Sequence, residues 1–551
     1  MAQGWYVNPV ADLIYFFAPV SSSSEVVVEE YLISSLNVTA IWALGSWSPI
    51  TGYPAVVEFF SDRLVSASTT RQPQTVWVSR TGDYSFHGKE TPIADSDAFS
   101  YTMNARQLNR IYDLIAKQDL LAATPGGIWR IGSADQPLTP GTVEAKAQPS
   151  VGSGPLRGLD VGDSYIYTTQ YGSQVRDLSY TFEADGYVGA DLTAFASHLV
   201  NSGQRRIISW TWALEPWSAV IAAREDGVML TMTYKREHQV VAWARHPLPR
   251  GKVLQVVSIP EGSAHGIYLC VERVINGEAV RMMERLADRV ENGGDPREYV
   301  GLDCSLTYDG RNASATTIML SGGAAAGSEV TMTASASLFV AGNVGDQIVI
   351  DYDGTPCRIS IEAVDSATVA RGTASRPLVT ADLSPGTDWA LAVDTLSGLD
   401  HLEGEEVQVG GDGFDLGLYT VSGGSITLRA PAVLAHVGVP FDADFESLDM
   451  TVVGGASVAN RSKVIKQVGI LVEGTQTISA SSTGFDRMER YKARDSGLSM
   501  SVPPPFRTEW LDPPLNVGGE WKRNPRIYIR APGPYSAKVL AIEPHFDIGA
   551  S

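Results

Sequence analysis

Residues 52–86, GYPAVVEFFSDRLVSASTTRQPQTVWVSRTGDYSF, decide the fold class. An apolar run rich in β-branched and aromatic residues begins at Val56, is interrupted at Asp62-Arg63 and then resumes. The polar segment Gln72–Gln74 breaks the pattern, and a second strand begins at Val76–Val78 before a Thr-Gly-Asp turn. The stretch therefore predicts two strands separated by a polar loop.

The composition extends this prediction to the whole chain. The 551 residues are 44% hydrophobic and only 19% charged, as in globular proteins. The chain contains 53 glycines and 30 prolines, so turns are frequent and elements are short, which favours an all-β protein. The length predicts roughly two to four domains.

The charge and the cysteines limit the classes of function. A net charge of −20 argues against general electrostatic binding of nucleic acid or anionic lipid. The charge fits simple solubility, and it also fits a conduit whose wall repels the phosphates of sliding DNA. Cys270, Cys304 and Cys357 are odd in number and widely spaced, so they form neither a disulfide framework nor a zinc site.

The N-terminus and the hydropathy predict where the chain is made. Residues 1–10, MAQGWYVNPV, lack the basic and apolar regions of a secretory signal. No apolar run approaches the roughly 20 residues of a membrane helix. We therefore expect synthesis in a reducing cytoplasm and no membrane insertion.

Short strands and tight turns continue to about residue 302. Apolar spacing predicts two short helices in this part, at Gln107–Lys117 and Asp191–Val200. Strands this short with turns this frequent predict an irregular β-propeller, although no strict repeat gives a blade count. The hairpins with the clearest turn sequences are Leu120–Ile131, Tyr165–Tyr180, Val220–Tyr234 and Ile267–Glu284, the last around Asn276-Gly277.

Changes in amino-acid composition along the chain predict four segments. Residues 1–45 form an N-terminal arm with strands expected at Leu13–Phe17 and Glu25–Ile33, which either pairs with a neighbouring subunit or forms a first strand pair. Residues 46–302 form the first part of the propeller. Residues 303–395, rich in Ala, Ser, Gly and Thr, form an inserted small β-domain. Residues 396–551 form a β-meander and the strands that close the propeller, which are expected at Arg526–Ile529 and Val539–Ile542. Within this segment Lys463–Glu473 fits the apolar spacing of both a strand and a helix, and it is predicted as a strand.

Two acidic pairs and one acidic loop are candidates for chemistry. Glu183 with Asp185, and Glu225 with Asp226, fit the general acid–base pairs of a glycan-cleaving propeller. Each pair also flanks a glycine at a hairpin turn, where acidic residues are common. Residues 351–354, DYDG, resemble part of a calcium loop but lack the third ligand and the closing glutamate, so a turn is expected.

The remaining candidates also have a structural interpretation. His238 and His246 bracket a strand, and we expect them to cap or pair rather than to bind a metal. Walker, HExxH, GxSxG and CxxC motifs are absent. Trp210, Trp212 and Trp217 are candidates for stacking on a sugar, but the same residues would also suit packing in a propeller core. The one local basic cluster consists of Arg461, Lys463 and Lys466. We expect it either to bind the acidic face of a neighbouring subunit or to protect an exposed strand edge.

The order of elements in residues 52–86 resembles the tail nozzle family of short-tailed phages, also called tail tubular protein B or tail stabilisation protein. The shared order is a strand, Asp-Arg-Leu, a polar loop with Gln-Pro, a Trp-bearing strand and Gly-Asp. Similar segments span about Gly45 to Pro544. They are Leu178–Tyr187 with Asp191–Thr193, Asp226–Glu237 with Trp243–His246, Val274–Gly277 with Met283–Leu286, Gly342–Gly345, and His401–Gly404 with Asp412-Gly413.

The resemblance implies a structural virion protein. In this family a hexameric ring of irregular propellers with inserted β-domains hangs below the portal and the adaptor. Its channel conducts DNA, and it presents sites for tail fibres or spikes. The family is structural, so the resemblance implies no enzyme activity and no catalytic, cofactor-binding or metal-binding residues. The chain would be made in the host bacterial cytoplasm and reside in the virion tail.

One departure and two alternatives accompany the resemblance. The family usually carries a long platform region before the Gly-Tyr-Pro sequence, whereas about 50 residues precede it here, so a shortened platform is expected. The alternative function is a propeller-based glycan-binding or glycan-cleaving tail protein. A third hypothesis is a soluble propeller scaffold unconnected with virions.

Overall fold

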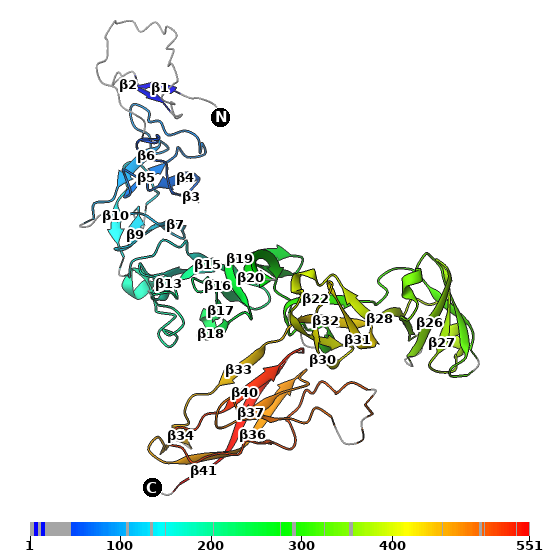
Figure 1. Cartoon of the computed structure of the whole chain (residues 1–551). Coiled ribbons are helices and arrows are strands. Elements are labelled where there is room, and N and C mark those ends of the chain that lie inside the picture. Colours follow the sequence, from blue (N-terminus) through cyan, green and yellow to red (C-terminus); the bar gives the residue numbers. More distant parts are fainter. Residues whose placement is uncertain are drawn as a thin grey trace. The chain divides into compact units, whose positions relative to one another are not determined.

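The computed structural model describes residues 5–8, 13–16 and 46–549, apart from 106–108, 133–135, 149, 202, 276, 289–293, 324, 352–355, 454–455, 495–496, 498, 501 and 536. The described chain is all-β, as predicted, and its sheets are antiparallel (Figure 1). Its helices are 3₁₀ turns of three or four residues. The described sheets show no closed barrel or propeller.

The chain divides into two compact units. The N-terminal unit contains Met1–Pro247 and Lys252–Val271, and the C-terminal unit contains Leu248–Gly251 and Glu272–Ser551. At the N-terminus, β1 (Trp5–Asn8) pairs with β2 (Leu13–Phe16), where a strand was predicted at 13–17. The strand predicted at Glu25–Ile33, and the question of what the arm pairs with, lie outside the described residues.

The stretch at 52–86 forms three strands, so the prediction of two strands was wrong in one respect. β3 (Val56–Phe60) and β4 (Arg63–Ala67) are separate strands joined by Ser61-Asp62. Both turn residues have positive φ, +48° and +55°, which is the two-residue turn whose twist suits a hairpin. Polar Asp62 therefore marks a reversal of the chain rather than a break within one strand. β5 (Thr75–Val78) and β6 (Phe99–Thr102) complete a four-stranded sheet.

Three more four-stranded sheets follow, each with its strands in chain order. The first strands of the four sheets begin at residues 56, 113, 159 and 207. The strands are β7 (Asp113–Ala116), β8 (Leu120–Thr124), β9 (Gly127–Ile131) and β10 (Ala145–Ala147); β11 (Leu159–Val161), β12 (Ser164–Thr168), β13 (Val175–Thr181) and β14 (Gly186–Val188); and β15 (Ile207–Ala213), β16 (Ala219–Arg224), β17 (Met229–Lys235) and β18 (Val240–His246).

Neighbouring sheets of this series share hydrophobic cores. In β8, Leu120 and Ala122 join a core with the first sheet, while Leu121 and Ala123 join a core with the third sheet. A third core lies between the third and fourth sheets and includes Ile166 and Leu230. Because successive side chains of a strand point to opposite faces, one strand can serve two cores. The second and third sheets are therefore buried on both faces, and β8 and β12 are buried at every position.

Both predicted helices were wrong. Two of the apolar residues placed on one face of a helix at Gln107–Lys117 lie instead on β7, where Leu114 faces one core and its neighbour Ile115 faces the other. Ile111 precedes this strand, and Leu108 lies outside the described residues. Two adjacent buried residues mimic a helical spacing when a strand is covered on both sides. Residues 191–200 form a series of turns, with i to i+3 bonds such as the Ala196 N–H to the Thr193 carbonyl. Leu192, Ala196, Leu199 and Val200 of this segment do reach the core between the third and fourth sheets, whereas Phe195 is exposed.

The division between the units falls within the sheet of β19 (Gly251–Glu261), β20 (Ala264–Ile275) and β21 (Glu278–Arg285). On the C-terminal side, buried Arg273 donates to Glu284 at 2.5 and 2.7 Å and to Asp303 at 2.9 Å. Two carboxylates around one buried guanidinium balance its charge and fix its direction. The turn at Asn276 lies outside the described residues.

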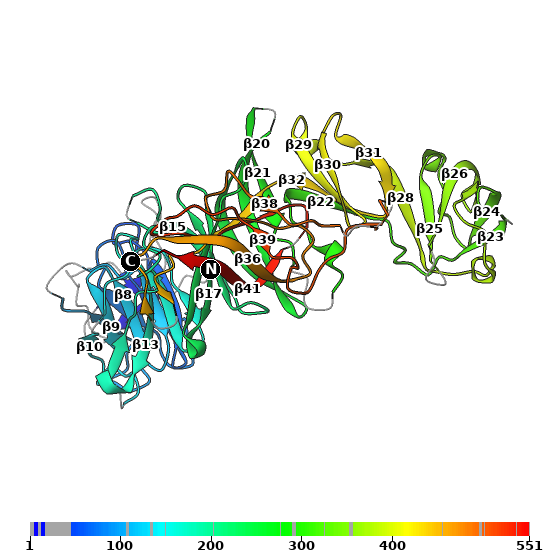
Figure 2. The same ribbon diagram turned by 90° about the horizontal axis from the view of Figure 1, so that it is seen from below.

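The C-terminal unit contains a small module with its own core. Its seven-stranded sheet has the order β23-β24-β27-β26-β25-β28-β31, seen from a second direction in Figure 2. Arg311 and Ala390 form a bridge, so the chain enters and leaves the core-bearing part side by side. The strands are β23 (Ile318–Gly322), β24 (Glu329–Ala334), β25 (Gln347–Ile350), β26 (Cys357–Ser366), β27 (Val369–Ala374), β28 (Trp389–Ser397) and β31 (Ser425–Ala432).

Two further cores lie in the C-terminal unit. One lies beneath the sheet of β22 (Asp303–Asp309), β32 (Leu434–Val439), β29 (Glu406–Gly411) and β30 (Phe414–Thr420). The other lies between two sheets, which together form the C-terminal sandwich. Its first sheet has β33 (Asp442–Glu446), β40 (Tyr528–Pro532), β37 (Ser479–Ser481) and β38 (Glu489–Arg490), and its second has β39 (Leu515–Asn516), β36 (Lys463–Glu473) and β41 (Lys538–Ile548). The strand predicted at Lys463–Glu473 is thus confirmed, with the predicted bounds.

Candidate functional site

The first strands of the stacked sheets lie against one another in pairs, β3 with β7 and β11 with β15. Arg157, just before β11, joins them. Its guanidinium lies 3.1 Å from Glu58 of β3 and 3.6 Å from Asp113 of β7. Its carbonyl oxygen accepts a 2.7 Å hydrogen bond from the indole of Trp210 in β15. One residue thus contacts the first strands of the other three sheets.

Asp113 is the buried carboxylate of this junction. It accepts hydrogen bonds from the Tyr165 hydroxyl, from the Gly158 N–H at 3.1 Å and from the Leu114 N–H at 3.0 Å. Burial raises the pKa of Asp113 and, more strongly, that of Tyr165. Since these partners already occupy both carboxylate oxygens, the group is suited to holding sheets together rather than to moving a proton to or from a substrate.

The two predicted acidic pairs lie at hairpin turns. Glu183 lies in η1 (Phe182–Ala184), and Asp185 follows with a φ of +41° and accepts a 3.0 Å bond from the Tyr180 hydroxyl. Glu225 and Asp226 each have their own arginine. Arg206 donates to Glu225 at 2.9 and 3.1 Å, and Arg224 donates to Asp226 at 2.9 Å.

These arginines shift the pKa values of Glu225 and Asp226. The hydrogen bonds from Arg206 and Arg224 lower the pKa values of Glu225 and Asp226, respectively. A glycosidase acid needs the opposite shift, a raised pKa that keeps it protonated near neutral pH. Glu225 and Asp226 therefore lack the environment of an acid–base pair.

The histidine and tryptophan candidates have structural partners. His246 lies 2.8 Å from the Thr231 hydroxyl across β17 and β18, which agrees with the predicted pairing role. His238 ends η2 (Arg236–His238) at the turn before β18. Trp210 is buried in the core between the third and fourth sheets and Trp212 packs against it, whereas Trp217 is partly exposed. The three indoles do not share one exposed face.

The predicted basic cluster is dispersed. Arg461 donates to the Gly549 carbonyl at 3.0 and 2.7 Å. Lys463 is fully buried, and its ammonium donates to the Val458 carbonyl at 2.7 Å. Lys466 is exposed and forms an ion pair with Asp547. The three cations do not form one basic surface.

The cysteines and the acidic loop offer no assembled metal site. Cys270, Cys304 and Cys357 are free thiols, and burial raises the pKa of Cys304 to about 12. Asp353 and Gly354 lie outside the described residues. Within the described residues, no three His, Cys, Asp or Glu side chains gather as metal ligands. None of the helices in the described part of the chain has the length and apolarity that a membrane crossing requires.

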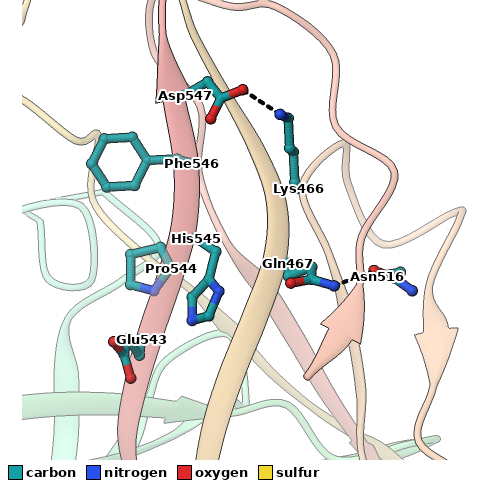
Figure 3. A pocket seen from close by; sticks show the side chains of 8 residues that line it. All are labelled: Lys466, Gln467, Asn516, Glu543, Pro544, His545, Phe546 and Asp547. Atoms are coloured by element: carbon teal, nitrogen blue, oxygen red, sulfur yellow. Dashed lines mark hydrogen bonds and ion pairs between the residues drawn. The ribbon is translucent and has the colours of Figure 1, made fainter. Parts of the chain in front are cut away.

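An open groove lies on the outer face of the β39-β36-β41 sheet (Figure 3). Along β41, Glu543, His545 and Asp547 are exposed, whereas the alternating Ile542 and Phe546 pack on the core of the C-terminal sandwich. The eight residues that line the groove are Lys466, Gln467, Asn516, Glu543, Pro544, His545, Phe546 and Asp547.

Two interactions between strands organise the groove. Lys466 bonds to Asp547, and the Gln467 amide nitrogen donates to the Asn516 side-chain oxygen at 2.8 Å (Figure 3). Lys466 is the extra residue of a bulge, because Ile465 pairs with Phe546 and Gln467 with His545. The bulge turns the ammonium onto the same face as the carboxylate. The groove therefore presents amides, an imidazole and carboxylates side by side.

The sequence matches no protein-family model and no curated protein. Sequence reasoning missed both Arg157 and the groove. Arg157 stands in a loop without a motif, so only the fold reveals its partners. The groove did have a signal, since Glu543, His545 and Asp547 alternate with apolar residues in a strand that was predicted only at 539–542.

Proposed function

We propose that the protein is a structural virion protein, a subunit of a hexameric phage tail nozzle that forms the distal DNA-ejection channel. The observation that carries the proposal is the series of four-stranded sheets that begins at β3 and stacks face to face. Propellers are built from blades of four antiparallel strands. The series begins in the stretch that resembles the nozzle family, and contacts between first strands are those expected of adjacent blades.

The outer edge of the fourth sheet supports assembly with other subunits. β18 has the sequence VVAWARH, is the last strand of its sheet, and exposes Val240 by 38% and Val241 by 42%. The outer strands of the first three sheets have only three or four residues. Proteins usually cover or charge a long apolar edge, because its free backbone groups would otherwise pair with other chains. A neighbouring subunit in a ring would cover it.

The proposal also specifies surroundings and charge. The ring would sit below the adaptor, carry tail fibres or spikes, and pass genomic DNA without reading its sequence. We propose that the channel wall is mainly acidic, because the chain has a net charge of −20 and a wall of that sign repels phosphate. In this assignment the irregular propeller is part of each subunit, and the protein is not an enzyme.

Electron microscopy tests the proposal directly. The full chain, alone and after addition to the adaptor-capped portal of the same virus, should give six-fold rings with a central opening. The double variant Val240→Lys/Ala242→Lys should weaken ring formation by charging the β18 edge. The matched control Ser100→Lys, on the four-residue strand β6, should assemble normally.

Two outcomes would contradict the proposal. One is a compact particle without an opening that stays monomeric in both preparations. The other is a ring whose lumen, once mapped, is lined mainly by lysine and arginine.

A further inference from the structure

The polar groove of the C-terminal sandwich lies between two exposed tryptophans. At one end, a Cβ placed on Gly469 would lie 3.6 Å from the Glu543 Cβ and 3.7 Å from the Cζ3 atom of Trp510. At the other end, a Cβ placed on Gly549 would lie 3.4 Å from the Cζ3 atom of Trp521. Each glycine thus lies close to an indole ring, with no side chain of its own between the sheet and that ring.

The two indoles and the polar row share one face of β41. Positions 543, 545, 547 and 549 alternate along the strand, so all four point to the side opposite the core. Trp510 is 46% and Trp521 is 56% exposed. Six residue steps separate Glu543 from Gly549, which is a length of roughly 20 Å in an extended strand. The face is therefore an elongated strip with an aromatic surface at each end.

The charges of the strip argue against an anionic ligand. Lys466 is already neutralised by Asp547, and Glu543 is a further carboxylate, so the surface does not attract phosphate or nucleic acid. Gln467 and Asn516 share one hydrogen bond, which does not use the Gln467 oxygen or the Asn516 nitrogen, and both residues line the groove. Within the described residues, the Glu543 and His545 side chains have no hydrogen-bond partner. Donors and acceptors thus alternate without a net positive charge.

We propose that this strip binds a linear, uncharged polysaccharide. A sugar hydroxyl both donates and accepts hydrogen bonds, so it can pair with an amide, an imidazole or a carboxylate. The C–H faces of sugar rings pack on the exposed π-face of an indole, which is apolar yet tolerates polar neighbours. A chain of several rings is long enough to contact both tryptophans and the polar row between them. This inference is independent of the proposed nozzle function.

Affinity electrophoresis of the full chain tests the proposal. Native gels would contain dextran, yeast mannan, a neutral bacterial O-polysaccharide or, as an anionic comparison, alginate. We expect at least one neutral polysaccharide to retard the protein. Trp510→Ala and Trp521→Ala should each weaken the apparent affinity about tenfold, and the double variant should abolish retardation. His545→Ala and Asn516→Ala should weaken it less.

A matched control separates binding from folding. Trp217→Ala removes a partly exposed tryptophan of the N-terminal unit and should leave retardation unchanged. All variants should migrate like the parent protein in gels without polysaccharide. The proposal is overturned if no neutral polysaccharide retards the parent, if alginate alone does so, or if the double tryptophan variant is retarded as strongly as the parent.

Discussion

The stacked sheets of the N-terminal unit and the C-terminal sandwich use β-strands in different ways. In β8 every residue is buried, because its two faces serve two cores. In β41 the burial alternates, because one face packs on a core and the other meets water in the groove. The difference shows that a strand covered on both sides cannot offer a ligand surface except at its edge. A sheet at the end of a sandwich has a whole face free.

The organisation of the cores also differs. In the stacked sheets of the N-terminal unit each of the three cores described above is shared by two neighbouring sheets, so a sheet loses packing when its neighbour unfolds. In the C-terminal unit the small module, the β22-β32-β29-β30 sheet and the sandwich each have a separate core. We therefore expect the stacked sheets to unfold together and the C-terminal modules to unfold more independently.

Substitution of adjacent residues in β8 should have the largest effect. Leu120→Ala and Leu121→Ala should each lower the free energy of unfolding by about 2–5 kcal/mol, because both side chains are fully buried, in different cores. Hydrogen exchange of the backbone amides in β8 and its neighbouring sheets, monitored at increasing denaturant concentration, measures this loss. If only one of the two variants is destabilised, the strand is not covered on both faces.

The same experiment in β36 should show destabilisation of the protein at only one of two adjacent positions. Ile470→Ala removes a fully buried side chain of the sandwich core and should cost about 2–5 kcal/mol. Leu471→Ala, at the neighbouring position on the outer face, should cost less than about 1 kcal/mol. Equal losses at both positions, measured by hydrogen exchange of the C-terminal sandwich, would refute the free outer face.

Acid should weaken the β22-β32-β29-β30 sheet through His436. This buried ring lies 2.8 Å from the Thr307 hydroxyl and 2.8 Å from the Arg297 carbonyl, with Asp309, Arg311 and Glu298 as the nearby charges. Burial lowers the pKa of His436 below 6.5, so the unfolded chain binds the proton more readily than the folded chain.

Stability is therefore complete above about pH 6.5 and falls below that value, by at most about 1.4 kcal/mol per pH unit. His436→Gln should flatten the dependence between pH 7 and 5, as measured by hydrogen exchange of β32. An unchanged slope in this variant would assign the acid sensitivity to another group.

Removal of residues 312–389, the part of the small module that bears its core, should have the smallest effect on the rest of the protein. β28 from Ala390 onward and β31 stay in place, because they also contribute to the core beneath the β22-β32-β29-β30 sheet. The bridge between Arg311 and Ala390 keeps the two chain ends adjacent, so a short Gly-Ser linker can replace residues 312–389. The β22-β32-β29-β30 sheet has its own core and should lose less than about 1 kcal/mol. Loss of exchange protection throughout this sheet would show that the modules are not independent.

Local sequence rules predicted most of the strands. Val, Ile and aromatic runs between Gly, Pro and Asp turns gave the hairpins at Leu120–Ile131 and Tyr165–Tyr180, which the structure confirms. They failed at Gln107–Lys117, because adjacent apolar residues that serve two cores have the spacing of a helix. The local rules also merged β3 with β4. The two-residue turn between these strands, Ser61-Asp62, has positive φ values but lacks the glycine that usually marks such a turn in a sequence.

The candidate sites were less predictable than the strands. Glu225 and Asp226 suggested acid–base chemistry. Arg224, which lowers the pKa of Asp226, is only two residues away, but Arg206 comes close enough to lower the pKa of Glu225 only in the folded chain. Arg157 meets Glu58, Asp113 and Trp210 only when four sheets are stacked. Contacts between residues so far apart in the sequence depend on packing, which a local pattern does not encode.

The sequence by itself determined the all-β class, the short turn-linked strands and the acidic charge, because strand propensity, turn chemistry and ionisation act over a few residues. Only the tertiary structure decided which faces of those strands are buried. Leu120 and Leu121 read alike in the sequence, yet they enter different cores. Trp510 and Trp521, 11 positions apart, lie beside one polar strip because β41 pairs with β36 and brings Gly549 and Glu543 beneath them.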